Sequence, residues 1–226
     1  MRPQLVIGNK NYSSWSLRPW LAARHAGIDF EEIRVSLFTP EGNEQIQRYS
    51  PSLRVPVWRE DDFVVWDSLA ICEYLAERVP SLWPSDSAAR AIARSVSAEM
   101  HSGFTPLRGG MPMNARARGR SVEITPEVAA DINRIEAMWL DCRSRFGAGG
   151  PWLFGKFSIA DAMFAPVVLR FVPYGVTRPG VVDEYVATWM ADPHLQAWIA
   201  YAQQESEVIE SEEIGQVAEG DQEVEP

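Results

Sequence analysis

Apolar and polar residues alternate with two different periods along the chain, and the change of period divides the chain into two parts. In the first part, Gln4–Gly8 is a short apolar run and Phe30–Leu37 alternates, as strands do. Val55–Trp58 and Phe63–Trp66 flank a charged turn, which predicts a hairpin. Between the first two strands, apolar residues at helical spacing predict a helix that ends at Gly27.

A second helix completes this first unit. Apolar residues from Cys72 to Val79 fall at the i, i+3, i+4, i+7 spacing of a buried helix face. Pro80 and Pro84 then end the unit. The element order is strand, helix, strand, loop, two strands and helix, and we expect a first domain over residues 1–80.

The second part is predicted to be almost wholly helical, and we expect it to form a domain over residues 86–205. Apolar stripes run from Ala89 to Met100 and from Val128 to Phe146. A third helix begins at Ser158, with Asp161 three residues later as a cap that locks the fold. Two shorter helices are predicted over residues 183–190 and 194–204.

Charge is distributed unevenly along the 226 residues. The formal net charge is −10, and the segment from Glu205 to Pro226 holds nine acidic residues and no Lys or Arg. All 21 basic and 22 of the 31 acidic residues therefore lie in residues 1–204, which are nearly neutral. Such a body has no basic patch for nucleic acid, so we expect no nucleic-acid partner. Residues 206–226 are predicted to be an acidic, disordered tail.

Other features indicate a cytoplasmic protein that has neither a metal nor a membrane partner. Cys72 and Cys142 cannot form a disulfide-dense scaffold, and both lie on apolar helix stripes as inert core thiols. The apolar stretch at the N-terminus is too short for a signal sequence. No apolar run approaches the 20 residues that a membrane span needs. His25 and His194 are isolated and lack metal-ligand spacing.

Three segments at the predicted strand and helix ends could carry chemistry. The first is Tyr12–Pro19, in which Ser13, Ser14 and Ser16 lie between a strand and a helix start. These serines can serve as helix caps. Alternatively, a hydroxyl at a helix N-terminus can stabilise an anion such as a thiolate, because the helix end carries partial positive charge.

The second segment is Val55-Pro56, where a proline precedes a strand. A trans proline on an edge strand is one interpretation. A cis bond that turns the backbone of Val55 outward, toward an extended peptide, is the other.

The third segment is Asp67-Ser68, an acid and a hydroxyl at the start of a helix. Helix capping is the simpler interpretation. In the functional one, the two residues hold a zwitterionic amino-acid head, with Asp67 on its ammonium group and Ser68 on its carboxylate.

Together these segments identify a resemblance to the cytosolic glutathione transferases, closest to the zeta (maleylacetoacetate isomerase-like) and related serine-type bacterial members. Ser13–Arg18 is similar to their SSCS-x-R loop, and Val55-Pro56 to their Val-Pro strand. Asp67–Leu75 is similar to their Q/E-S-x-A-I-x-E-Y-L helix start. Phe157–Ala162 is similar to a helix start in their second domain. The resemblance covers residues 4 to about 204.

The resemblance implies an α/β thioredoxin-like N-terminal domain that binds glutathione as co-substrate, followed by an all-α helical-bundle C-terminal domain. It implies that Ser13 stabilises the glutathione thiolate, with Ser14 as the reserve. Val55, with Pro56, pairs with the cysteinyl backbone, and Asp67 with Ser68 holds the γ-glutamyl end. A hydrogen bond to a charged group contributes roughly 1.5–3 kcal/mol, which is enough to lower a thiol pKa by about two units without a metal.

The resemblance also places a second-substrate pocket in the helical domain. The residues expected to contact a small electrophilic, hydrophobic co-substrate are Trp15, His101, Arg108 and Asn114. Helix-surface or interdomain hydrogen bonding is the alternative role for His101 and Arg108. Trp15 stands where zeta members have Cys, and the loop has no cysteine, so thiol exchange is disfavoured.

We therefore expect a glutathione S-transferase that forms homodimers. A glutathione-dependent isomerase of the maleylacetoacetate type, or a peroxidase, is one alternative. A non-catalytic protein of the same fold that binds glutathione is another.

Overall fold

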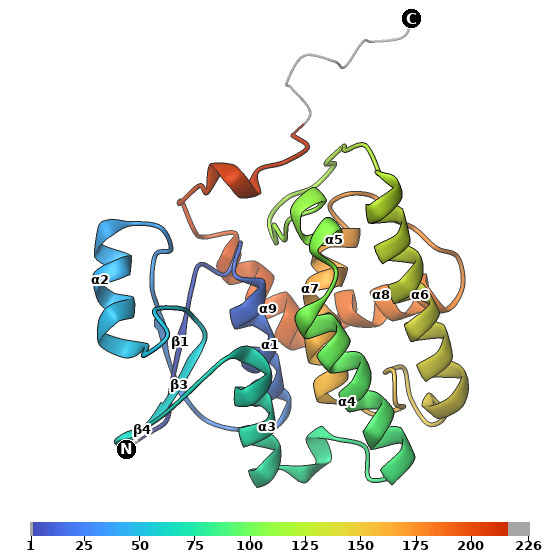
Figure 1. Cartoon of the computed structure of the whole chain (residues 1–226), viewed down its shortest axis with the longest axis horizontal. Helices are drawn as coiled ribbons and strands as arrows, with labels where there is room; N and C mark the ends of the chain where they lie inside the picture. Colours follow the sequence, from blue (N-terminus) through green and yellow to red (C-terminus); the bar gives the residue numbers. More distant parts are fainter. Residues whose placement is uncertain (1, 217–226) are drawn as a thin grey trace, which may run out of the picture.

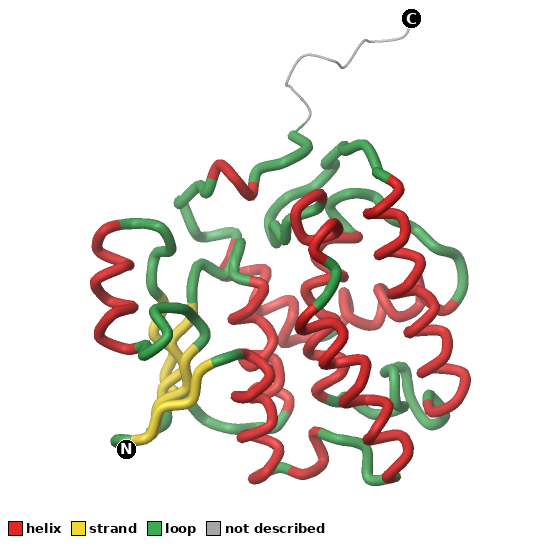
Figure 2. The backbone as a smooth tube through the Cα atoms, in the orientation of Figure 1, coloured by secondary structure: helices red, strands yellow, loops and turns green. Residues whose placement is uncertain are grey.

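A computed structural model of the chain describes residues 2–216. Its N-terminal part contains one four-stranded sheet in the order β2-β1-β3-β4, seen edge-on at one side of the molecule (Figure 2). The strands are β1 (Gln4–Ile7), β2 (Glu31–Arg34), β3 (Val57–Glu60) and β4 (Phe63–Trp66). β1 is parallel to β2 and antiparallel to β3, and β3 and β4 form the predicted hairpin.

Helices cover both faces of this sheet, because alternate residues of β1 point to opposite sides. Leu5 and Ile7 pack toward α1 (Ser14–His25) and α3 (Ser68–Arg78) in the main hydrophobic core. On the other face, Val6, Val35, Ile46 and Val57 form a smaller core under α2 (Pro40–Tyr49). Figure 1 shows α2 outside the sheet and α1 and α3 between the sheet and the second domain.

The second domain is helical and is organised around α7 (Ile159–Phe171), a helix whose residues are all buried. A helix that is apolar on every side needs neighbours on every side, and α7 packs against α1, α4, and α8. Its contact with α1 joins the two domains. The other elements are η1 (Pro80–Leu82), α4 (Ser87–Ser102), α5 (Thr105–Gly110), α6 (Pro126–Phe146), α8 (Val181–Ala191), α9 (Pro193–Ala202) and η2 (Glu210–Glu212).

The predicted division near residues 80–86 falls in the connection that contains η1, between α3 and α4. Every predicted strand and helix has a counterpart in the structure. Two short helices, α2 and α5, were not expected from the sequence pattern.

The expected disordered tail needs a correction between residues 206 and 216. Glu207 forms an ion pair with Arg34, Glu213 accepts a hydrogen bond from Tyr12, and Ser121 donates to the carbonyl oxygen of Gly215. This segment is therefore packed against the body of the protein. The rest of the predicted tail, residues 217–226, lies outside the described residues.

Candidate active site between the serine loop and the helical domain

Helix α1 begins at the serine loop without a side-chain cap from any residue between 2 and 216. Ser13 precedes the helix, but its hydroxyl donates to Ser16 Oγ at 2.8 Å instead of accepting from an amide. Ser16 Oγ also accepts from the Gly8 amide at 3.1 Å. The Ser14 hydroxyl has no partner within the described part of the chain. The Ser14 amide donates to the Tyr12 carbonyl oxygen at 2.9 Å, but the Ser14 hydroxyl is free to bind a ligand.

These serines line a cavity of about 550 Å³ between the two domains. Five residues predicted for the site lie on its wall: Ser13, Ser14, Trp15, Val55 and Arg108. The remaining wall comes from the serine loop, from α2 and the loops on either side of it, from α7 and from the C-terminal segment: Tyr12, Leu37, Phe38, Asn43, Ile46, Leu53, Arg54, Arg170, Ile209 and Glu212. The sequence therefore identified five of the fifteen residues that line this cavity and missed the other ten.

The Val55–Pro56 peptide bond is cis, which is the bond geometry that the second of the two interpretations of this segment expected. Val55 lies on the cavity wall, and Pro56 is buried directly before β3. Val55 thus lines the cavity together with Ser13 and Ser14 of the serine loop.

Asp67 both caps a helix and keeps one carboxylate oxygen for another partner. Its Oδ1 accepts from the amides of Leu69 and Ala70 at the start of α3, and its Oδ2 lies 2.7 Å from His101 Nε2. The residue adopts a φ of +76°, a left-handed conformation that Asp tolerates better than most side chains. The structure thus joins two predicted residues, Asp67 and His101, that the sequence analysis had assigned to different substrates.

Ser68, beside Asp67, is almost completely buried, and its hydroxyl has no hydrogen-bond partner among the described residues. Leaving a buried hydroxyl unpaired costs about 1–3 kcal/mol. An unpaired hydroxyl next to a carboxylate at a helix start is therefore a position where a ligand can supply the missing bond.

Trp15 connects the serine loop to the helical domain. Its indole meets the edge of the His101 ring at a centroid distance of 5.3 Å. The guanidinium carbons of Arg18 and Arg108 lie 4.3 and 4.8 Å from the indole centroid, both within cation–π range. Trp15 is 37% exposed, so its ring also contacts the open space of the cavity.

Three arginines with few counterions surround this part of the cavity. Arg18 is fully buried, and none of its guanidinium nitrogens has a hydrogen-bond partner in residues 2–216. Burial, and then the charges of Arg108 and Arg170, lower its pKa well below the ordinary value. Burial also lowers the pKa of Arg108, and it lowers that of Arg170 to about 10. The arginines destabilise one another's charge, so an anion in the cavity is favoured.

Arg170 was missed by the sequence analysis. It lies near the end of α7, donates to the Met111 carbonyl oxygen at 2.6 Å and lines the cavity. The available signal was a single charged residue in the otherwise apolar stretch from Ala162 to Phe171. A single charged residue in an otherwise apolar helix breaks the expected hydrophobic pattern, and such breaks are common at functional sites.

Asn114, the fourth residue expected to contact the co-substrate, lies beside the C-terminal segment. Its amide group donates to Glu213 Oε1 at 2.8 Å, and it does not line the cavity. Ile209 and Glu212 of the same C-terminal segment do line the cavity, a position that the sequence pattern did not indicate.

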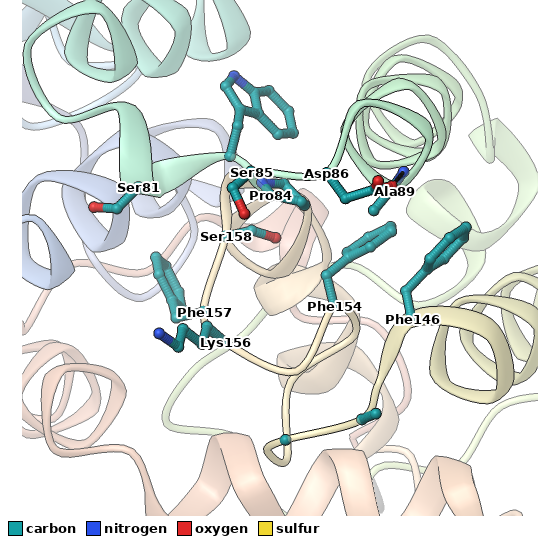
Figure 3. Close-up of a pocket in the computed structure, with 13 residues that line it drawn as sticks. Ser81, Pro84, Ser85, Asp86, Ala89, Phe146, Phe154, Lys156, Phe157 and Ser158 are labelled. Atoms are coloured by element: carbon teal, nitrogen blue, oxygen red, sulfur yellow. Dashed lines mark hydrogen bonds between the residues drawn. The ribbon is translucent and has the colours of Figure 1, made fainter.

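A second cavity, of about 470 Å³, lies beside the start of α7 (Figure 3). Its wall includes Phe146, Phe154, Phe157 and Lys156, and it contains none of the predicted site residues. Ser158 borders it, but its hydroxyl donates to Asp161 Oδ2 at 2.9 Å. This helix start is therefore already satisfied within the protein.

Within residues 2–216, no three His, Cys, Asp or Glu side chains are grouped so that they could hold a metal ion. In the same part of the chain, none of the helices combines the length and the apolar character needed to span a bilayer.

Comparison with known proteins assigns both domains. The family model for the glutathione S-transferase N-terminal domain matches residues 12–78, and the model for the C-terminal domain matches residues 125–200. Maleylacetoacetate isomerase from Rattus norvegicus is 28% identical over 173 residues, which cover 74% of this chain and 77% of that protein. Glutathione S-transferase Z2 from Arabidopsis thaliana is 26% identical over 171 residues, 70% and 74% of the two chains.

Solved structures show the same architecture. A glutathione transferase homologue from Burkholderia with bound glutathione aligns with a TM-score of 0.67 at 24% identity, covering 90% of this chain and 98% of that one. A glutathione S-transferase from Bombyx mori aligns with a TM-score of 0.70 at 20% identity, covering 90% and 95%. The fold is the predicted thioredoxin-like domain followed by an all-α domain, and the chain belongs to the glutathione S-transferase family.

Proposed function

We propose that this chain is a glutathione-dependent enzyme that binds glutathione in the 550 Å³ cavity and stabilises its thiolate at the start of α1. The observation that carries the proposal is the uncapped helix start, where Ser14 faces the cavity with a free hydroxyl. The helix N-terminus favours an anion, and a hydroxyl that donates to sulfur favours the thiolate over the thiol. A thiolate at this position attacks an electrophilic carbon of a hydrophobic co-substrate.

The two serines have different roles in this proposal. Ser14 is the first donor because Ser13 already donates to Ser16 Oγ. Ser13, the residue favoured by the family resemblance, becomes the second donor when its hydrogen turns from Ser16 to the sulfur. This exchange replaces a hydrogen bond between neutral groups by one to a charged acceptor, which is stronger.

Asp67 and Ser68 do not line the cavity, but Asp67 is joined through His101 to Trp15 on the cavity wall, so the tripeptide is proposed to extend to them. The backbone of Val55, which lies on the cavity wall, is proposed to pair with the cysteinyl residue. The γ-glutamyl ammonium group binds Asp67 beside His101, and the γ-glutamyl carboxylate gives the buried Ser68 hydroxyl its missing partner. A ligand with both charges is therefore better suited to this end than a simple anion.

The test is a titration of bound glutathione in Ser13→Ala, Ser14→Ala and the wild type, with Ser95→Ala on the outer face of α4 as the matched control. Removing a donor to the thiolate is expected to raise the pKa of the bound thiol by about 1–2 units, because such a bond is worth roughly 1.5–3 kcal/mol. Thiolate absorbance reports this pKa, and turnover with a chlorodinitrobenzene should fall about 10- to 100-fold. Glutathione affinity should stay within a few fold. Unchanged pKa and turnover in both variants would exclude the serine mechanism.

Isomerisation of an acidic substrate is the second candidate function. The arginines Arg108 and Arg170 on the cavity wall favour it, and the rat relative is named a maleylacetoacetate isomerase. In this reaction the thiolate adds to a carbon–carbon double bond and leaves after rotation, while the arginines hold the carboxylates. Comparing glutathione-dependent cis–trans isomerisation with conjugation and hydroperoxide reduction, on one enzyme preparation, separates the alternatives.

We also propose that the protein forms a homodimer and works in the cytoplasm. Phe63 and Trp66, at the two ends of the edge strand β4, are 51% and 48% exposed, and exposed aromatic side chains on an edge strand favour association. Cys72 and Cys142 are free thiols, and cysteines without disulfides are typical of proteins in a reducing compartment such as the cytoplasm. Light scattering after size exclusion measures the oligomeric state directly.

A further inference from the structure

The C-terminal segment 205–215, which we call the strap, is fastened to the backbone of the serine loop. The Glu205 carboxylate accepts from the amides of Lys10 and Asn11 at 2.7 and 3.0 Å. Tyr12, the residue before Ser13, donates its hydroxyl hydrogen to Glu213 at 2.6 Å. The strap therefore binds the loop immediately before the serines.

Arginines from both domains hold the strap in place. Arg34 of the sheet domain donates to Glu207 at 2.6 Å, and this bond lowers the pKa of Glu207 to about 2. Arg116 donates to the carbonyl oxygen of Glu207 at 2.7 Å, and Arg120 forms an ion pair with Glu213. Figure 1 shows the strap crossing from the side of α2 to the side of α5. Its position is thus fixed from both sides of the cavity.

This arrangement places Glu212 on the cavity wall, opposite arginines that have no direct partner from the strap. Glu212 and Ile209 line the cavity together with Arg108 and Arg170. The charges of Glu212 and Arg170 influence each other, but the two side chains form no ion pair within 4 Å in the described structure. Burial raises the pKa of Glu212. The carboxylate therefore lies near enough to Arg170 for their charges to interact, without a direct ion pair, on the wall of a cavity that a ligand can fill.

Glu212 is the one acidic side chain among the described residues that line this cavity, against three arginines, Arg54, Arg108 and Arg170. A second anion placed between Glu212 and the arginines is attracted by the arginines and repelled by Glu212. In a partly buried cavity such a like-charge interaction is weakly screened.

We propose that Glu212 is a specificity-determining residue, which the strap holds in the co-substrate space to weaken the binding of carboxylate-bearing electrophiles relative to neutral ones. This inference rests on the proposed function only in taking the part of the cavity beside Glu212, Arg108 and Arg170 as the co-substrate site, next to glutathione at the serine loop. An uncharged electrophile experiences no electrostatic repulsion from Glu212 when it binds in the cavity. A carboxylate-bearing one binds Arg108 and Arg170 at full strength only when Glu212 is neutralised or withdrawn.

The test compares Glu212→Gln with Glu210→Gln, a matched control that removes one charge from the same short helix η2 at a residue outside the cavity wall. The probes are a chloronitrobenzoate and its methyl ester, and calorimetry measures their binding to the full chain without glutathione. Glu212→Gln is expected to bind the benzoate about fivefold more tightly, with ester affinity unchanged, because one like charge at this range is removed. Glu210→Gln should resemble the wild type with both probes.

Three results would overturn the inference: an unchanged affinity for the benzoate in Glu212→Gln, an equal gain in Glu210→Gln, or no binding of the benzoate to any form. None of these results depends on glutathione. The thiol titration of the serine variants tests the proposed function separately, so the two failures can be told apart.

Discussion

Helices α1 and α7 both begin after a serine, both border a cavity, and yet their first turns are built in opposite ways. At α7, the Asp161 carboxylate accepts from the Ser158 amide, the Ser158 hydroxyl, the Leu153 amide and the Tyr185 hydroxyl, all at 2.8–3.0 Å. At α1, no side chain caps the first turn within the described chain, and the Ser14 hydroxyl is free. One helix start is satisfied by the protein itself and the other is open to a ligand.

The difference arises at the third position after the serine. That position is Asp161 in α7, a carboxylate that neutralises the helix end and collects four donors. In α1 it is Ser16, whose neutral hydroxyl accepts hydrogen bonds from the Ser13 hydroxyl and the Gly8 amide. Because Ser16 carries no charge, the positive end of α1 stays available for an external anion. A single residue type thus distinguishes the closed helix start of α7 from the open helix start of α1.

The largest effect is expected from Asp161→Asn, which breaks the closed helix start. An Asn side chain presents an NH₂ group to buried donors, so at least one of them loses its acceptor. We expect the free energy of unfolding to fall by about 3–5 kcal/mol, as for the loss of one partner from a buried charged network. Urea denaturation measures this loss, and Asp86→Asn at the exposed cap of α4 should cost less than about 1 kcal/mol.

Asp161 also makes the free energy of unfolding depend on pH, with higher stability at low pH. Burial raises the pKa of Asp161 to about 6 in the folded protein, above its ordinary value of 3.8. The folded state therefore holds this proton more tightly than the unfolded chain. The resulting stabilisation is full below pH 3.8 and is lost as the pH rises through about 6. Asp161→Asn should lack this component in a pH series, and an identical pH profile in variant and wild type would contradict it.

Ser16→Asp is expected to have the next largest effect, because it gives α1 the carboxylate that α7 has. A charge within about 5 Å of the sulfur opposes the thiolate by roughly 3 kcal/mol at an effective dielectric constant near 20. The pKa of bound glutathione should therefore rise by about two units, and turnover should fall about 100-fold. Ser16→Asn, of nearly the same size but neutral, is the control. A variant that keeps its turnover would show that the open start of α1 is not the thiolate site.

The sequence predicted the two helix starts unequally well. The capping role of Asp161 could be predicted because it depends on a serine and an acid three residues apart. Whether Ser13 and Ser14 serve as caps or as ligands could not be decided, because a cap is defined by hydrogen bonds that only the folded loop shows. The cis bond at Val55–Pro56 was likewise one of two alternatives until the backbone was known.

The elements that were missed have weak hydrophobic patterns or distant partners. Helix α2 buries Ile46 as its one large apolar side chain, so its stripe is too short to be recognised, although Thr39 and Pro40 are good start signals. The strap was read as a disordered tail because its local composition is acidic. Its partners Arg34 and Arg116 are about 90 to 170 residues away in the chain. Ion pairs between such distant residues leave no local periodicity.

A smaller effect is expected from Asp67→Asn, which separates the two roles of this residue at α3. Asn is as good a helix cap as Asp and tolerates the positive φ, so the free energy of unfolding should change by less than about 0.5 kcal/mol. The proposed contact with the ligand ammonium loses its charge, and glutathione affinity should fall about tenfold. Calorimetric titration measures this loss. An unchanged affinity would leave Asp67 with the capping role alone.

The smallest effect is expected at the two buried cysteines, each of which interacts with a charged residue of one of the two helices. Burial raises the pKa of both thiols, that of Cys142 to about 12. Cys72 of α3 also interacts electrostatically with Arg18 of α1, and Cys142 of α6 with Asp161 of α7. Neither should react with a disulfide reagent in the folded protein at pH 8, except through local opening. Single-cysteine variants distinguish the two. S-methylglutathione should slow the reaction of Cys72 several-fold and leave that of Cys142 unchanged, because only the α1 start gains a partner on binding. Equal protection of both thiols would mean that the ligand stabilises the whole protein. It would contradict the expectation that ligand binding stabilises the open start of α1 more than the closed start of α7.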